Sequence, residues 1–161
     1  MNEEQQRLKE RQFVENVGLL FEQLGGTRME GRIMGWLLIC DPPQQSAGEL
    51  AGALMASKGS ISTATRQLIQ MGVVERVSLP GKRRDYFVIK QDSMDKLIQR
   101  RMAVMTEFRR LFEQGLELLD GKAPEARRRL EIIHAMYTFF EKEMPDLMAR
   151  WERERIRLTL S

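Results

Sequence analysis

Hydrophobic residues recur at intervals of three and four along most of the chain, which predicts a largely helical protein. The first such run covers residues 4–24 and is followed by two glycines, which commonly end a helix. A second run covers residues 29–40, with Thr27 as its expected N-cap. Residues 36–39 are all apolar, so we expect the end of this second helix to be buried.

Two short helices joined by a turn are predicted next, after a proline-containing loop at residues 41–43. Ser46 is the expected N-cap of the first, because Glu49 completes the spacing of a capping box. The turn at 57–59 precedes the second helix, residues 60–71. Its apolar positions form a narrow stripe that should be buried, namely Ile61, Ala64, Leu68 and Met71. The opposite face is polar and carries Ser62, Thr63, Arg66, Gln67 and Gln70.

Two runs of β-branched and aromatic residues, 73–77 and 85–89, flank a Pro-Gly pair and predict a β-hairpin. Lys82, Arg83 and Arg84 directly follow this pair, so they should lie at or near the tip. One interpretation of cations on an exposed hairpin is that they simply prevent edge-to-edge association with other strands. We favour a binding role, because these three cluster at the tip and follow a helix with a polar face.

Positive charge is concentrated in the same region. The whole chain has a net charge of +3, whereas residues 58–90 hold seven cations and two acids, a net charge of +5. The alternative interpretation of a basic cluster is a solvated surface without a ligand. Here, however, the cluster coincides with a helix-turn-helix followed by a basic wing. That order of elements suits a helix in the major groove of DNA and a wing in the neighbouring minor groove.

Two more helices are expected in the last part of the chain. The apolar face of the first, residues 92–119, consists of Met94, Ile98, Met102, Met105, Phe108, Phe112, Leu116 and Leu119. After a break at 120–124, a heptad-like seam runs through Leu130, Ile133, Tyr137, Phe140, Met144, Leu147 and Trp151. Pro145 should kink this last helix or begin a new turn.

These flanking helices carry more apolar surface than one small winged domain can cover, which predicts a homodimer. The alternative is a monomeric helical bundle that caps the wing. The fold class is thus mainly α with a small β-hairpin wing, a winged helix-turn-helix lobe plus a helical dimerisation lobe. We expect residues 1–26 to be the N-terminal helix of the dimerisation lobe, 27–90 the DNA-binding domain and 91–161 the C-terminal dimerisation region.

Several classes of protein are disfavoured by the sequence. It contains no run of about 18 apolar residues, so no membrane-spanning helix is expected. The charged N-terminus lacks the apolar core of a secretory signal. Cys40 is the only cysteine, which excludes an internal disulfide framework and suits a cytoplasmic protein.

An enzyme is also disfavoured. The only histidine, His134, is flanked by Ile132, Ile133 and Met136 and has no candidate nucleophile nearby in the sequence. A nucleophile pair of Cys40 and His134 stays open, but nothing supplies a third member. No metal-ligand spacing, phosphate loop or nucleotide-binding glycine motif is present, so we expect neither a metal nor a cofactor.

Four motifs carry a family resemblance: TRMEGRI at 27–33, SKGSIS at 57–62, GVVER at 72–76 and PGKRRDY at 80–86. Residues 48–87 resemble winged-helix regulators of the MarR (multiple antibiotic resistance regulator) family, and the wider chain resembles its GbsR-type branch. The resemblance implies a dimeric cytoplasmic transcription factor, usually a repressor, often released from DNA by a small ligand or by oxidation. Cys40 ends the second helix, so the first-helix cysteine that senses peroxide in some relatives has no counterpart here.

The wing departs from the family pattern. Many relatives have an aspartate just before the key arginine, whereas here the acid, Asp85, follows Arg84. We favour Arg83 as the residue that enters the minor groove, with Lys82 or Arg84 on phosphate.

We expect Arg66 to contact guanine and Lys58 to contact phosphate. The full set of predicted DNA-binding residues is Lys58, Ser60, Ser62, Thr63, Arg66, Gln67, Lys82, Arg83 and Arg84. A dimer would present two such helices to an inverted repeat with half-sites about one helical turn apart. The alternative is a winged-helix protein–protein module, which would be expected to lack the wing cations.

A small-molecule effector is a further possible partner. We expect such a ligand to lodge between the winged lobe and the dimer helices, where it would change the spacing of the two DNA-reading helices. Candidate lining residues are Met34, Trp36, Met102, Met105 and Phe108. Plain core packing is the favoured interpretation of each one taken alone.

Overall fold

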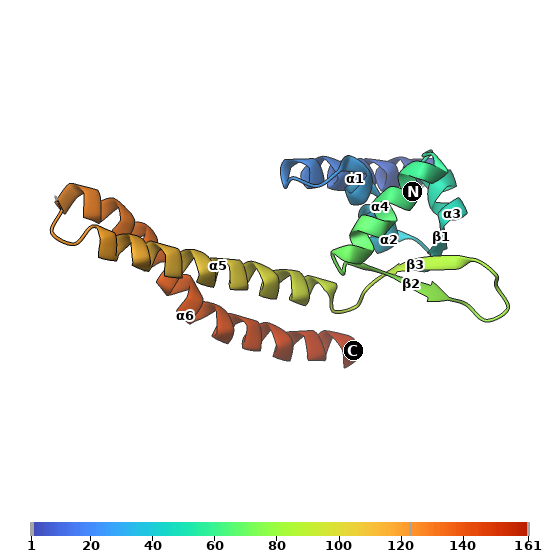
Figure 1. Ribbon diagram of the computed structural model, residues 1–161. Coiled ribbons are helices and arrows are strands. Elements are labelled where there is room, and N and C mark those ends of the chain that lie inside the picture. The colour runs from blue at the N-terminus through green and yellow to red at the C-terminus, as the bar shows by residue number, and fades with distance from the viewer. Residues whose placement is uncertain (1, 123, 161) are drawn as a thin grey trace. The chain divides into compact units, whose positions relative to one another are not determined.

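The computed structural model describes residues 2–122 and 124–160 and consists mainly of helices (Figure 1). The elements in chain order are α1 (Glu3–Gln23), α2 (Arg28–Ile39), β1 (Gln45–Ser46), α3 (Ala47–Ala53), α4 (Lys58–Gln70), β2 (Val74–Ser78), β3 (Asp85–Ile89), α5 (Ser93–Leu118) and α6 (Pro124–Leu160). The chain divides into two compact units, Met1–Lys96 and Leu97–Ser161. The expected fold class, mainly α with a small β wing, is confirmed.

The sheet has three antiparallel strands in the order β1-β3-β2, one more than the sequence predicts. Strands β2 and β3 form the expected hairpin, with Val74 opposite Ile89 and Ser78 opposite Asp85. The additional strand, β1, is only two residues long and pairs with the other edge of β3. A strand this short has no alternation of its own to detect, and it exists only through this pairing.

The core of the first unit lies between the helices and the sheet. Seven side chains there are less than 2% exposed, namely Ile33, Leu50, Ile61, Leu68, Val73, Val74 and Ser93. Helices α1 and α2 approach closely at Gly18 and Gly31. A Cβ added at Gly31 would lie 2.7 Å from the Gly18 Cα and from the Val17 carbonyl oxygen. Glycine at this position therefore allows the two helices to touch.

Two expectations for the first unit are wrong in detail. The second helix of the helix-turn-helix begins at Lys58 rather than Ser60, because Ser57 is its N-cap and accepts a hydrogen bond from the Ser60 N–H. The end of α2 is not fully buried, since Leu38 is 50% and Ile39 40% exposed. Leu37 alone turns into the core there, as expected when only one stripe of a helix faces inward.

In the second unit, α5 and α6 pack side by side as an antiparallel pair. The Phe112 and Tyr137 rings meet edge to face, with centroids 5.1 Å apart. A Cβ at Gly115 would come within 2.8 Å of the Leu130 side chain. Pro145 was expected to kink this helix or to begin a new turn. No new turn begins there, because α6 continues through Pro145 as one helix.

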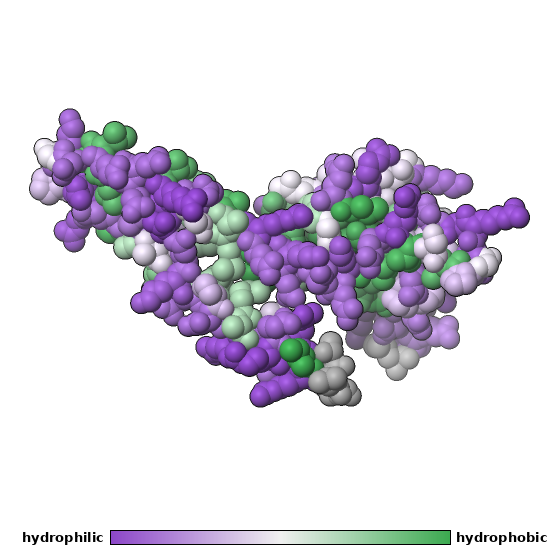
Figure 2. Space-filling view, turned by 60° about the horizontal axis from the view of Figure 1, so that its bottom comes forward, coloured by the Kyte–Doolittle hydropathy of each residue, from purple (hydrophilic) through white to green (hydrophobic). Residues whose placement is uncertain are grey.

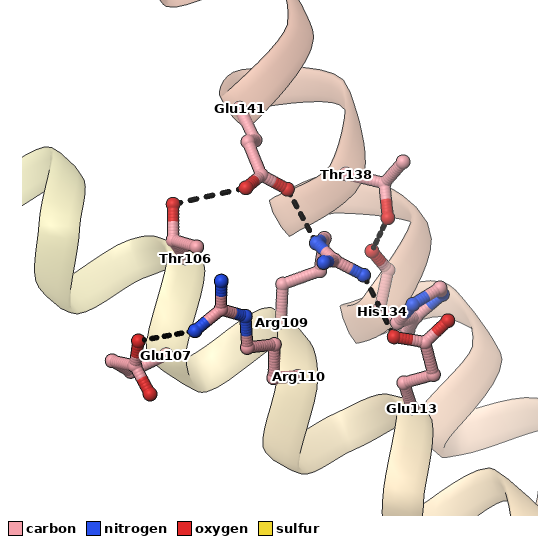
Figure 3. Close-up of polar contacts among 8 residues, drawn as sticks. All are labelled: Thr106, Glu107, Arg109, Arg110, Glu113, His134, Thr138 and Glu141. Carbon is pink, nitrogen blue, oxygen red and sulfur yellow. Dashed lines mark hydrogen bonds and ion pairs between the residues drawn. The ribbon is translucent and has the colours of Figure 1, made fainter.

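A polar cluster links the same two helices (Figure 3). Arg109 on α5 contacts Glu141 on α6 and, at 2.9 Å, Glu113 on its own helix. The hydroxyl of Thr106 donates to the other Glu141 oxygen at 3.0 Å. The hydrogen bond to Glu113 and the nearby Glu141 raise the pKa of Arg109. This guanidinium is therefore a permanent charge that joins the two helices.

Much of the apolar surface of α5 and α6 stays open in the single chain. Exposed apolar side chains appear between polar ones along these helices, at the left of Figure 2. Leu118 is 79% and Phe139 59% exposed. Seven members of the two predicted stripes are also exposed, namely Met94, Ile98, Phe108, Ile133, Phe140, Leu147 and Trp151. Among the described residues, no helix is both long and apolar enough to cross a membrane.

Candidate nucleic-acid interface

Helix α4 separates an apolar face from a polar one, as its sequence predicts. Ile61, Ala64 and Leu68 are almost fully buried. Thr65 is also buried, and its hydroxyl donates to the Ile61 carbonyl at 2.8 Å. Because that hydroxyl is satisfied within the helix, Thr65 belongs to the inward face and not to the candidate interface.

The remaining polar side chains of α4 share its outer face. Ser62, Thr63, Arg66 and Gln67 are exposed, whereas Ser60 is partly covered. The structure thus brings together the five predicted residues 60–67. Lys58 is also exposed, and it is the first residue of the helix. There the free backbone N–H groups and the lysine together favour an anion.

A shallow groove lies along this face, between α4 and the start of α2. Ser60, Thr63 and Gln67 line one side, and Thr27 and Met29 line the other. Neither Thr27 nor Met29 was expected near the interface from the sequence. The motif that contains them was visible, but its position beside α4 depends on the packing of the two helices.

The wing tip is a tight turn that carries the three predicted cations. The Lys82 N–H donates to the Leu79 carbonyl at 3.0 Å, and Gly81 has a φ of 73°. This is the left-handed position of a type II turn after proline, which glycine adopts without strain. Lys82, Arg83 and Arg84 are all exposed. Within the described part of the chain, no salt bridge engages any of the three.

The acid that follows the wing cations is directed elsewhere. Asp85 pairs with Arg76 on the neighbouring strand, with a guanidinium nitrogen 3.3 Å from its carboxylate. This pair joins β2 to β3 on the side of the sheet that leads to the wing tip. Asp85 therefore does not replace the aspartate that precedes the key arginine in many relatives.

Another acid, Glu49, has its pKa affected by the wing cations. Its carboxylate accepts a hydrogen bond from the Ser46 N–H at 2.6 Å, which completes the predicted capping box of α3. The pKa of Glu49 is lowered, first by its hydrogen bonds with Ser46 and then by the charges of Arg84 and Lys82. The capping box was predicted from spacing. The proximity to the wing was missed, because it depends on the pairing of β1 with β3.

Arg32, on α2, contacts both α1 and the end of α3. Its Nε lies 2.7 Å from a Glu15 oxygen on α1, and its Nη2 donates to the Leu54 carbonyl at 2.6 Å. Leu54 is the C-cap of α3. The turn of the helix-turn-helix is thus held to α1 and α2 through one guanidinium.

A cavity of about 190 Å³ lies beside this turn, lined by Arg11, Val14, Glu15, Arg32, Trp36, Ala53, Leu54 and Met55. Of the five residues expected to line an effector site, only Trp36 belongs to this cavity. Met34 does not line it, and Met102, Met105 and Phe108 lie in the second unit.

Among the described residues, no group of three or more His, Cys, Asp or Glu side chains could hold a metal ion. Burial raises the pKa of the Cys40 thiol, which disfavours the reactive thiolate. The His134 carbonyl accepts from the Thr138 hydroxyl at 2.9 Å (Figure 3), and no described side chain hydrogen-bonds to its buried Nε2.

Helices α2–α4 and the three-stranded sheet form a winged helix-turn-helix unit. A family model described as an MmpR5-like MarR family transcriptional regulator matches residues 92–154. The HTH-type transcriptional regulator MmpR5 of Mycobacterium tuberculosis (strain ATCC 25618 / H37Rv) is 39% identical over 142 residues, which cover 88% of this chain and 86% of that protein. A crystal structure described as a transcriptional regulator is 39% identical, with a TM-score of 0.68 over 90% of this chain and 99% of that one.

The chain therefore belongs to the MarR family of transcriptional regulators. Its named relatives are regulators and not enzymes.

Proposed function

We propose that this protein is a sequence-specific double-stranded-DNA-binding repressor that acts as a homodimer on an inverted-repeat operator. One observation carries the proposal. The first unit presents an exposed polar helix face next to a wing with three exposed cations that no described acid pairs as a salt bridge. The matching family model is described as MmpR5-like. Membership of the GbsR-type branch therefore stays a prediction.

Base reading is assigned to α4. Arg66 projects from the middle of the exposed face, and its guanidinium can donate two hydrogen bonds to the O6 and N7 of guanine. Ser62, Thr63 and Gln67 flank it with shorter polar groups. Ser60 and Lys58 lie at the N-terminal end, where a phosphate is held by backbone N–H groups and the lysine charge.

The wing supplies the second contact. Arg83 enters the minor groove and favours a narrow, A·T-rich segment, whose negative potential is enhanced. Lys82 and Arg84 contact phosphate. The exposure of all three side chains and the tight turn that carries them support this assignment.

Dimerisation is assigned mainly to α5 and α6. Exposed phenylalanine, leucine and tryptophan side chains along these helices leave a large apolar surface for a second copy to cover. A two-fold axis would then present two copies of α4 to two half-sites about one helical turn apart.

Release by a small ligand is part of the same proposal. The cavity beside Leu54 and Met55 borders the turn between α3 and α4. A ligand that binds there better in one conformation would shift the population of that conformation, and with it the position of α4.

Mobility-shift assays across a salt series test the groove assignment. Arg66→Ala should lose discrimination of about 1–3 kcal/mol at one base pair of each half-site. Arg83→Ala should weaken binding and flatten its salt dependence, because the variant lacks the cation that enters the negative minor groove. Arg129→Ala removes the same charge from α6 and should leave binding unchanged.

Unchanged binding of both variants would show that the grooves are read by other residues. Binding of the wild-type protein to no duplex at any salt concentration would favour the alternative, a protein–protein module.

A further inference from the structure

We propose that Glu49 is a positioning residue for the wing. Its carboxylate, fixed at the corner between β1 and α3, attracts Lys82 and Arg84 toward α3 and leaves Arg83 as the cation that enters the minor groove. The inference rests on the proposed DNA-binding function for its consequence, but the electrostatic interaction between Glu49 and the wing can be measured without DNA.

The Glu49 carboxylate is held in place by the capping box. It accepts from the Ser46 N–H at 2.6 Å, while the Glu49 N–H donates to the Ser46 hydroxyl at 3.3 Å. Ser46 is only 2% exposed and lies in the sheet. Both the carboxylate and the backbone N–H of Glu49 are therefore held by Ser46, although Glu49 is exposed to solvent.

Strand pairing brings this anchored acid to the wing. Ser46 lies opposite Tyr86 in the β1–β3 pair. Arg84 precedes Tyr86 by two residues on the side that leads to the wing tip, and Figure 1 shows α3 starting beside this part of β3. This register, with the hydrogen bond from Ser46, places the Glu49 carboxylate beside the strand that leads to the wing. The charges of Arg84 and Lys82 accordingly act to lower its pKa, in addition to the larger effect of its hydrogen bonds with Ser46.

No nearer acid competes for this role along the wing itself. Asp85 is engaged by Arg76, at the end of the strands next to the wing tip. Of the residues from 79 to 85, Asp85 is the only acid. Glu49 thus supplies a negative charge from outside the hairpin, on the α3 side of the tip.

Such an acid should affect specificity more than affinity. Exposed lysine and arginine side chains have many rotamers, and a fixed opposite charge narrows their range. The same charge opposes nonspecific attachment of Lys82 and Arg84 to phosphate. The protein then distinguishes its own site from other DNA better, while its affinity for DNA of any sequence falls. Specific interfaces commonly use such unfavourable interactions against the wrong partner.

A titration of the Glu49 carboxyl group by ¹³C NMR on the full-length protein tests the contact directly. Arg84→Gln and Lys82→Gln should each raise the pKa of Glu49. Arg83→Gln is the matched control, because it removes the same charge at the position between them and should produce a smaller change. An equal rise in the Arg83 variant, or no rise in any variant, would overturn the proposal.

A double-mutant cycle tests the consequence. Glu49→Gln keeps an oxygen that can accept from the Ser46 N–H, and circular dichroism checks that the helices are retained. On random duplex, Glu49→Gln should bind more tightly, with a salt slope steeper by about 0.9 for each additional phosphate that the wing neutralises.

On the best duplex selected from random sequences, the combined effect of Glu49→Gln and Arg84→Gln should differ from the product of the single effects by about threefold or more. The effects of Glu49→Gln and Arg83→Gln on binding should multiply more nearly when the two are combined. Multiplicative effects for both pairs would contradict a positioning role. If the wild-type protein binds no duplex, the proposed function fails, whereas the NMR titration still decides whether Glu49 acts on the wing.

Discussion

Met55 has an unusual backbone conformation. It lies in the turn between α3 and α4 with a φ of 48°, in the left-handed region, although it is not glycine. Its side chain is 73% exposed, so packing does little to offset the steric cost. The preceding carbonyl, that of Leu54, is held by Arg32. The turn is thus maintained by this contact and by its flanking helices, not by the preference of its own residue.

Replacement of Met55 by glycine should therefore stabilise the protein. The left-handed conformation costs about 1–2 kcal/mol for a residue with a Cβ, so Met55→Gly should raise the free energy of unfolding by about 1 kcal/mol. Urea denaturation measures this change. Ala56→Gly, at the next position and without a positive φ, should lower it by about 0.4–1 kcal/mol. A loss of stability in Met55→Gly would show that the side chain contributes more than its exposure indicates.

Glu49 should also make the stability depend on pH. Its pKa is lowered in the folded protein, so the carboxylate stabilises the fold above its ordinary pKa of about 4.3. That contribution is lost as the pH falls through the lowered value. The stability difference between the wild-type protein and Glu49→Gln should be present at neutral pH and disappear in acid. Thermal unfolding from neutral pH into acid measures it, and a difference that does not change with pH would contradict this account.

At the scale of the elements, close helix packing depends on glycine. Gly31→Ala would place a methyl group 2.7 Å from the Gly18 Cα and should destabilise the first unit by about 1–3 kcal/mol. Gly52→Ala is the control, because a Cβ there meets nothing within 4 Å. In a helix this second change should stabilise the protein by up to about 1 kcal/mol. If both variants lost stability equally in denaturation experiments, contact between α1 and α2 would not be the cause.

The elements predicted correctly are those defined by local signals. The N-cap at Thr27 and the capping box at Ser46 are present, because they depend only on residues within a few positions of one another. The predicted hairpin is present because two runs of β-branched and aromatic residues flank a Pro-Gly turn. Strand β1 was missed because two residues carry no pattern, and the influence of Glu49 on the wing was missed with it. The DNA contacts themselves stay predictions.

The expected burial at the end of α2 failed for a different reason. Leu38 and Ile39 are exposed because the first unit offers no surface that covers them. An apolar sequence indicates that burial is favourable, but it does not show whether the covering surface belongs to the same chain. The same reasoning applies to the exposed stripes of α5 and α6.

At the scale of the whole molecule, the exposed apolar stripes of α5 and α6 predict a dimer. A single substitution on one stripe should weaken it. Leu147 lies on the seam of α6 and is exposed in the single chain. Leu147→Glu should destabilise the dimer by about 2 kcal/mol or more, as expected for a central interface residue. Sedimentation velocity over a range of protein concentrations measures the shift toward monomer. Ala149→Glu adds the same charge to an exposed position off the seam and should leave the dimer intact.

The central claim is that two copies of α4 and the wing read an inverted repeat. Selection of bound sites from random duplex DNA with the purified full-length protein tests it most directly. We expect a palindrome whose half-sites are about one helical turn apart, since a two-fold dimer presents its reading helices at that spacing. Recovery of unrelated sequences, or of a single half-site without symmetry, would contradict the account.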